Sequence, residues 1–351
     1  MSAATLIAFV LLLAVAAYTC AGGTDYGAGF WDLTAGGAGR GKRPRWLIDH
    51  AMAPVWEVNN VWLIFVLVIM WTGFPVFFQT VFSAMWLPLA LAAIGIVLRG
   101  AGFALRKPTR RLAGRRIYGA VFAVSSLLSP FFLGAAAGGI ASGRVGPGIE
   151  PTAHAWYNPT SVFFGLLAVV GTALLGAVFL AADAVRYGAP DLHAYFRRRA
   201  LAALAVLAVL GVVTLAVAHA DAPHLWHGLS HGAGLVLLVL SILATAVTAW
   251  LLARTSGAWS RVSAVVVMGS AVLAWGLAQR PYLIPGRLTV AEAAGAPSTL
   301  HWLVIVTAVA VVLVFPAVAL LYRLDTRGDL EPLTDADLRR GEAGPEPGGG
   351  A

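Results

Sequence analysis

Nine long apolar segments, separated by short polar stretches, dominate the pattern of hydrophobic and polar positions along the chain. They cover residues 5–30, 58–77, 80–98, 117–140, 161–184, 200–220, 231–253, 262–278 and 300–322. A helix needs about 20 mostly apolar residues to cross a bilayer, and inside lipid its backbone groups must pair within the segment. Because these runs are continuous and do not alternate, they predict an all-α polytopic membrane protein with about nine transmembrane helices.

The composition supports this prediction and excludes several classes of protein. Hydrophobic residues make up 59% of the chain and charged residues only 11%, with a mean hydropathy of +0.81. Soluble chains carry about 25% charged residues, so an ordinary soluble enzyme or a disordered protein is excluded. The formal charge of +8 does not indicate nucleic-acid binding, because the basic residues form no dense stripe with interleaved aromatics.

The basic residues instead indicate topology. Of the 24 Lys and Arg residues, 20 fall in one alternating set of loops and the tail, three fall in the other set, and Arg99 lies at a helix end. Cytoplasmic loops carry the excess of such residues, so we expect the N-terminus outside and the C-terminus in the cytoplasm. The first segment lacks a positively charged leader, which favours a span over a cleaved signal peptide. We expect a transmembrane domain over residues 1–325 and a disordered cytoplasmic tail over 326–351, where acidic residues, Gly and Pro accumulate.

Asp25 is the first of two acidic residues that we consider candidate functional residues. It follows about 19 apolar residues, in the stretch GGTDYGAG of residues 22–29. Gly23 and Gly27 share a helix face and permit close contact with another helix. Placing an acidic side chain inside a membrane costs free energy, so such a residue indicates a functional site. The alternative is that Asp25 marks a helix end at the membrane interface, hydrogen-bonded and without a function.

Glu57 is the second such acid, and it stands near Asn60 and Trp62 in the stretch WEVNNVW. One interpretation is that Glu57 only caps the helix, since acidic residues are favoured at helix N-termini. Glu57 and Asn60 also share a helix face, where a carboxylate and carboxamides could hold water for a proton path. Asp25, Glu57, Asn60 and Trp62 are therefore the proton-path candidates, and no residue of this chain is expected to be catalytic by itself.

Histidines and the single Cys20 offer little metal chemistry. His219, His224, His227 and His231 cluster between the sixth and seventh segments, and His227 and His231 have the i, i+4 spacing that can share a metal. A solvated role in this short loop is the more common outcome, so we expect no metal. No two histidines lie at matched depth in two spans, so we expect no haem held by this chain alone. One cysteine excludes a disulfide framework.

Several of these motifs together resemble subunit II of the cytochrome bd-type quinol oxidases, also called cytochrome d ubiquinol oxidase subunit II. The resembling stretches are GGTDYGAG (22–29), APVWEVNNVWLI (53–64), TGFP (72–75), FS (82–83), LRGAGF (98–103), QRPYLIP (279–285) and LTV (288–290). The match is dense over residues 20–105 and patchy from 106 to 278. Many members of the family carry an acid where this chain has Gly22, and Asp where it has Glu57.

The resemblance implies a fold of two four-helix bundles plus a peripheral helix, in a prokaryotic plasma membrane. It implies a heterodimer in which subunit I binds two b haems and haem d, oxidises quinol and reduces dioxygen to water in aerobic respiration. Subunit II would carry no haem, support assembly of its partner and contribute to proton and dioxygen access. The resemblance also admits small accessory subunits and a structural quinone.

Two other functions remain open from the residues alone. A proton-coupled transporter could use Asp25 and Glu57 directly, although no inverted repeat or pair of broken helices is evident in the sequence. In a purely structural membrane anchor, both acids would act as helix caps.

Overall fold

Helices make up nearly all of the described chain. The computed structural model describes residues 2–37, 41–52, 56–106, 112–150, 152–254 and 257–327. The chain divides into two compact units, residues 1–303 and 304–351. The helices and strands of the described residues are α1 Ala3–Thr34, α2 Lys42–Met52, α3 Trp56–Gly73, α4 Pro75–Ala84, α5 Trp86–Arg106, α6 Leu112–Ala141, η1 Ala153–Ala155, α7 Pro159–Arg186, α8 Pro190–Asp221, α9 Pro223–Ser230, α10 Gly232–Arg254, α11 Ala258–Ala278, β1 Tyr282–Ile284, β2 Leu288–Thr289, α12 Val290–Ala293 and α13 Pro297–Arg327.

The number of candidate spans confirms the predicted all-α membrane architecture. Within the described residues, eight helices are long and apolar enough to cross a membrane, and the number rises to nine if the bent pair α3–α4 counts as one span. The predicted boundary between the second and third segments was wrong, because α3 ends at Gly73 and α5 begins only at Trp86. Between them the chain turns by 116° into the short helix α4.

Pro75 explains this turn. Proline has no N–H to continue the helical hydrogen bonds, and it restricts the residue before it to extended conformations. Phe74 accordingly leaves the helical region, with φ −137° and ψ 64°, and α4 starts at Pro75. The backbone N–H of Gly295 donates to the carbonyl oxygen of Gly73 at 2.8 Å, so a segment far along the chain satisfies the group exposed at the bend.

In the first unit, the membrane helices pack in two sequential groups of four. The groups are α1 with α3, α5 and α6, and α7 with α8, α10 and α11; α1 and α6 also contact α7, which joins the two groups. This arrangement agrees with the two four-helix bundles that the family resemblance implies. The helices α1 and α7 approach each other closely at Gly27 and Gly176, where a Cβ on either residue would collide with the other helix's backbone. Trp31 fixes the same contact, because its indole N–H donates to the carbonyl oxygen of Ala173 at 2.7 Å.

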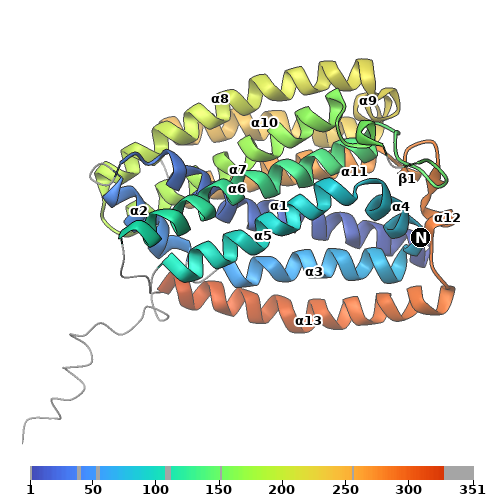
Figure 1. Ribbon diagram of the computed structural model, residues 1–351, viewed down its shortest axis with the longest axis horizontal. Coiled ribbons are helices and arrows are strands. Elements are labelled where there is room, and N and C mark those ends of the chain that lie inside the picture. Colours follow the sequence, from blue (N-terminus) through green and yellow to red (C-terminus); the bar gives the residue numbers. More distant parts are fainter. Residues whose placement is uncertain are drawn as a thin grey trace, which may run out of the picture. The chain divides into compact units, whose positions relative to one another are not determined.

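The two ends of this unit differ (Figure 1). At one end, called the α2 end below, lie the short amphipathic helix α2 and the last residues of α1 and α5. At the opposite end, called the α9 end, lie η1, α9, the β1–β2 hairpin and α12. A capping box starts α12, in which Thr289 and Glu292 exchange hydrogen bonds between side chain and backbone.

The second unit contains the larger part of α13, described as far as Arg327. Many of its apolar side chains are exposed, including Val311, Val312 and Leu313. The predicted tail, from residue 326 onward, lies almost wholly outside the described residues and stays a prediction.

Candidate functional site

Asp25 lies in the most tightly packed stretch of α1. Its side chain is only 5% exposed, and the neighbouring residues 22–23 and 26–29 are all buried too. As the sequence predicted, Gly23 and Gly27 share one face: a Cβ on Gly23 would meet Leu175 of α7, and one on Gly27 would meet the backbone of Thr172. Asp25 therefore lies inside the helix bundle, about 14 Å of helix before the end of α1.

The other three proton-path candidates belong to α3, which packs against α1. Asn60 and Trp62 are half-buried, and both take part in side-chain interactions. Glu57 belongs to the first turn of α3, and its side chain lies outside the described residues. Because α1 and α3 are in contact, Asp25 and the WEVNNVW stretch lie on neighbouring helices, as a shared site requires.

A buried arginine was missed by the sequence analysis as a member of this site. Arg99 of α5 is 7% exposed, and its guanidinium carbon lies 4.8 Å from the ring centre of Tyr26 and 5.3 Å from that of Phe122. A signal was available, because Arg99 is the one basic residue that belongs to neither set of loops.

Polar groups extend from Asp25 along α1 and α6. The hydroxyls of Tyr18 and Tyr26 share a hydrogen bond of 2.9 Å. Facing them, α6 contributes Ser125, Ser126 and Ser129, each at most 1% exposed. We call these six residues with Arg99 the polar seam: Tyr18, Asp25, Tyr26, Ser125, Ser126 and Ser129.

Two ion pairs lie at the α2 end of the unit. The Nε of Arg45 lies 2.7 Å from Oδ1 of Asp32, whose carboxylate is 4% exposed. The Nη2 of Arg261 lies 2.5 Å from Oδ1 of Asp183 and links α11 to α7. Both acids thus have cationic partners close to the basic loops, which is the behaviour of structural acids.

A large apolar cavity of about 740 Å³ lies between the two groups of helices. Its wall is almost entirely aliphatic and aromatic, and it includes Leu63, Phe82, Leu133, Leu215 and Ala271. Tyr18 and Tyr26 belong to the same wall, so the polar seam borders the cavity at these two residues. Cavities of 300–1,000 Å³ hold small ligands in other proteins.

The histidine cluster does not form a ligand set. His227 and His231 stack with ring centres 4.4 Å apart, while His219 contacts Trp226 and His224 contacts Tyr282. Among the described residues, no three His, Cys, Asp or Glu side chains come together as a metal site. The eight histidines lie in short helices or near helix ends, which does not fit a b haem held between two histidines inside the bundle.

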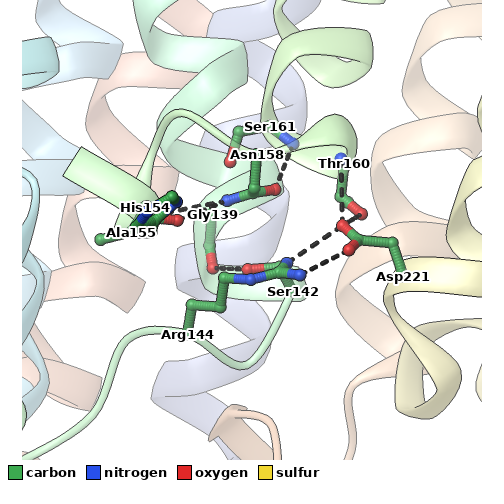
Figure 2. Close-up of polar contacts among 9 residues, drawn as sticks. All are labelled: Gly139, Ser142, Arg144, His154, Ala155, Asn158, Thr160, Ser161 and Asp221. Atoms are coloured by element: carbon green, nitrogen blue, oxygen red, sulfur yellow. Dashed lines mark hydrogen bonds and ion pairs between the residues drawn. The ribbon is translucent and has the colours of Figure 1, made fainter. Parts of the chain in front are cut away.

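A polar cluster at the α9 end joins three elements (Figure 2). Arg144, after α6, donates through Nη1 and Nη2 to the two carboxylate oxygens of Asp221 at the end of α8, at 3.0 and 2.5 Å. The same carboxylate accepts from the backbone N–H and hydroxyl of Thr160 in the first turn of α7. Asn158 caps α7 by accepting from the N–H of Ser161. This cluster is a structural clamp far from Asp25.

Comparisons with known proteins agree on one family. The family described as cytochrome bd terminal oxidase subunit II matches residues 3–325. The chain is 26% identical over 112 residues to cytochrome bd ubiquinol oxidase subunit 2 of Bacillus subtilis (strain 168), covering 32% of each protein. It is 25% identical over 186 residues to cytochrome bd-I ubiquinol oxidase subunit 2 of Escherichia coli (strain K12), covering 51% of this chain and 47% of that protein. The matched regions thus span a third to a half of these relatives.

The fold has a close counterpart among solved structures. A chain of the bd oxidase from Geobacillus thermodenitrificans superposes with a TM-score of 0.73, covering 92% of this chain and 98% of that chain. The sequence identity of 23% makes this a likeness of fold alone.

Proposed function

Because the chain belongs to the cytochrome bd terminal oxidase subunit II family, we propose that it is the non-haem membrane subunit of a quinol:oxygen oxidoreductase. Its partner would be a haem-bearing subunit I that holds haems b and d, oxidises quinol and reduces dioxygen to water. The placement of the histidines supports a partner as the haem carrier, since this chain offers no facing pair of them within its described spans. Small accessory subunits can complete such a complex.

The observation that carries a specific role for this chain is the burial of Asp25. A carboxylic acid at 5% exposure in the middle of a bundle is expensive to keep, and such acids mark proton relays in membrane proteins. We propose that Asp25 and Glu57 conduct protons from the cytoplasmic side towards the partner's oxygen-reducing site. Asn60 and Trp62, on the helix that carries Glu57 and packs against α1, would form the walls of this path.

The apolar cavity supports a second contribution, which is dioxygen access. Dioxygen is small and apolar, so it partitions into an aliphatic cavity that excludes ions. A cavity of about 740 Å³ also has room for a lipid acyl tail or for the ring and first tail units of a structural quinone, with Tyr18 and Tyr26 as polar contacts.

The distribution of basic residues supports the orientation. With 20 of 24 Lys and Arg residues in one set of loops and the tail, the α2 end would face the cytoplasm and the α9 end the outside of a prokaryotic plasma membrane. Asp25 would then lie in the cytoplasmic half of the bundle, which suits uptake of protons from that side.

Turnover of purified variant complexes tests the proton path. We expect Asp25→Asn and Glu57→Gln to keep normal haem content and to slow quinol-dependent oxygen consumption per haem, by roughly 100-fold or more for a group that transfers the proton itself. Asp191→Asn is the matched control, because Asp191 is half exposed in a surface ion pair with Arg43. Unchanged turnover in both acid variants would refute the proton path and leave a scaffold.

Dioxygen access has a separate test. Ala271 lines the cavity, whereas Ala258 at the start of α11 is exposed and does not. We expect Ala271→Phe to raise the KM for dioxygen with little change in kcat, and Ala258→Phe to change neither. Equal KM values in the two variants would show that dioxygen does not travel through this cavity.

A further inference from the structure

Arg99 is an unusual residue for the interior of a membrane protein because its charge is buried without a matching set of hydrogen bonds. Within the described residues, both Nε and Nη2 lack a hydrogen-bond partner. Arg261 also has a buried, unpartnered Nε, but its Nη2 is bound to Asp183. Buried polar groups in native proteins nearly always find a partner in protein or ordered water, so these two donor nitrogens of Arg99 require one.

The surroundings of Arg99 keep its side chain in place without satisfying it. The rings of Tyr26 and Phe122 hold the guanidinium through cation–π contacts. On the same face of α5, Gly95 and Gly102 allow the backbone to approach α6, since a Cβ on either would collide with α6. The arginine is thus enclosed between α1, α5 and α6.

Acceptor groups for water belong to α6, the helix that Arg99 contacts through the ring of Phe122. Ser125 and Ser126 donate their hydroxyl hydrogens to the helix carbonyls one turn earlier, at 2.6 Å each. Ser129 donates to the carbonyl oxygens of Ser125 and Ala92, at 3.1 and 3.3 Å. Because a hydroxyl has one hydrogen and two lone pairs, the serine oxygens keep the capacity to accept from water.

Arg99 lies at the level of the α1 stretch that carries Asp25. Its guanidinium carbon is 4.8 Å from the ring centre of Tyr26, the residue that follows Asp25 in the chain. A hydrated Arg99 would therefore bring water to the level of the buried acid.

We propose that Arg99 is a positioning residue that holds an internal water site in the polar seam, a role that rests on the proposed proton path through Asp25. Water accepts hydrogen bonds from Nε and Nη2 and donates to the serine oxygens of α6. A guanidinium stays protonated in proteins, so Arg99 orients this water and does not itself carry the proton. Each proton that reaches the water from one neighbour leaves to the next, so the site returns to its starting state.

A high-resolution cryo-electron microscopy map of the purified complex tests the water site directly, without reference to activity. We expect density for water at hydrogen-bond distance, about 2.7–3.2 Å, from Nε or Nη2 of Arg99, and its loss in Arg99→Met. A carboxylate, a lipid headgroup or a dry packing contact at those atoms would overturn the proposal.

Turnover then tests the positioning role. Arg99→Met should slow haem-normalised oxygen consumption by about tenfold, less than the roughly 100-fold or more that a proton-transferring side chain contributes. Arg99→Lys should recover part of the rate, because an ammonium also donates to water. The control is Arg144→Met, which removes an arginine from the clamp at the α9 end and should leave turnover per haem unchanged.

The combination with Asp25→Asn separates this inference from the proton path itself. If Arg99 acts through the path, Arg99→Met should cause no further slowing in an Asp25→Asn complex. Equal slowing in both backgrounds, or water in the map with full activity in Arg99→Met, would refute the positioning role. Normal turnover of Asp25→Asn alone would instead refute the proposed path, and the map would still decide the water site.

Discussion

The clamp between Arg144 and Asp221 at the α9 end should contribute measurably to stability. Asp221 accepts four hydrogen bonds, two from Arg144 and two from Thr160, and its side chain is only 16% exposed. Asp221→Asn keeps the shape of the side chain but removes the charge that Arg144 and the first turn of α7 require. The variant thereby leaves a half-buried cation and places an amide N–H₂ against existing donors (Figure 2).

The size of the effect follows from the partners that are lost. A hydrogen bond to a charged group contributes about 1.5–3 kcal/mol, and Arg144 is about one-third exposed, so water replaces part of its loss. We expect a net destabilisation of about 2–3 kcal/mol, below the roughly 3–5 kcal/mol for breaking a fully buried pair. For a large chain this corresponds to a fall of about 5 °C in melting temperature, at roughly 2 °C per kcal/mol.

Thermal unfolding of the purified complex in detergent measures this effect, with loss of haem absorbance as a second probe. The matched control is Asp191→Asn, which breaks the exposed pair with Arg43 and should cost about 0–1 kcal/mol. In a double-mutant cycle, Asp221→Asn should cost less once Arg144 is already replaced by Met. Equal melting temperatures for Asp221→Asn and Asp191→Asn would refute the reasoning, since burial would then make no difference.

Three further predictions concern other parts of the molecule. Gly176→Ala should lower the melting temperature by the equivalent of about 1–3 kcal/mol, because its Cβ would collide with the α1 backbone, whereas Gly211→Ala in open space should not. The backbone N–H and the hydroxyl of Thr289 donate to Glu292 and hold the pKa of its carboxyl below its ordinary value. The stabilisation of α12 by Glu292 is therefore present at neutral pH and is lost as the pH falls through that lowered pKa. Hydrogen exchange of the α12 amides, corrected for intrinsic rates, should become faster in acid, and an unchanged rate would contradict this. In a background without the native cysteine, a cysteine that replaces Glu150 should react with an impermeant maleimide on intact cells, because we expect this loop outside. A cysteine that replaces Arg254 should not react, because we expect that loop in the cytoplasm. The opposite pattern would show that the topology is inverted.

Most of the membrane architecture could be predicted from the sequence, because burial in lipid constrains about 20 consecutive residues at a time. The break at Gly73–Pro75 could not, although both residues were visible. A proline in an apolar run can kink a helix or end it, and the local sequence does not say which. Here the carbonyl oxygen of Gly73 exposed at the break accepts from Gly295, more than 200 residues away, a contact that only the tertiary fold creates.

The acids and their partners show the same limit. The free-energy cost of a charged side chain in lipid was enough to identify Asp25 as a candidate, and the side chain is buried in the structure. The same reasoning passed over Arg99, because a basic residue close to a span end is ordinarily explained by topology. The partners of Asp32, Asp183 and Asp221 were also invisible, since these ion pairs join elements that only the tertiary fold brings together.

Copurification is the most direct test of the central claim that this chain is the non-haem subunit of a bd-type oxidase. The tagged chain should be solubilised in mild detergent from membranes of its native host, and the visible spectrum of the purified material recorded. We predict a second membrane chain, with the absorption bands of b and d haems that stay with that chain when the two are separated. Recovery of this chain alone and without haem, or haem that remains on it after separation, would contradict the assignment.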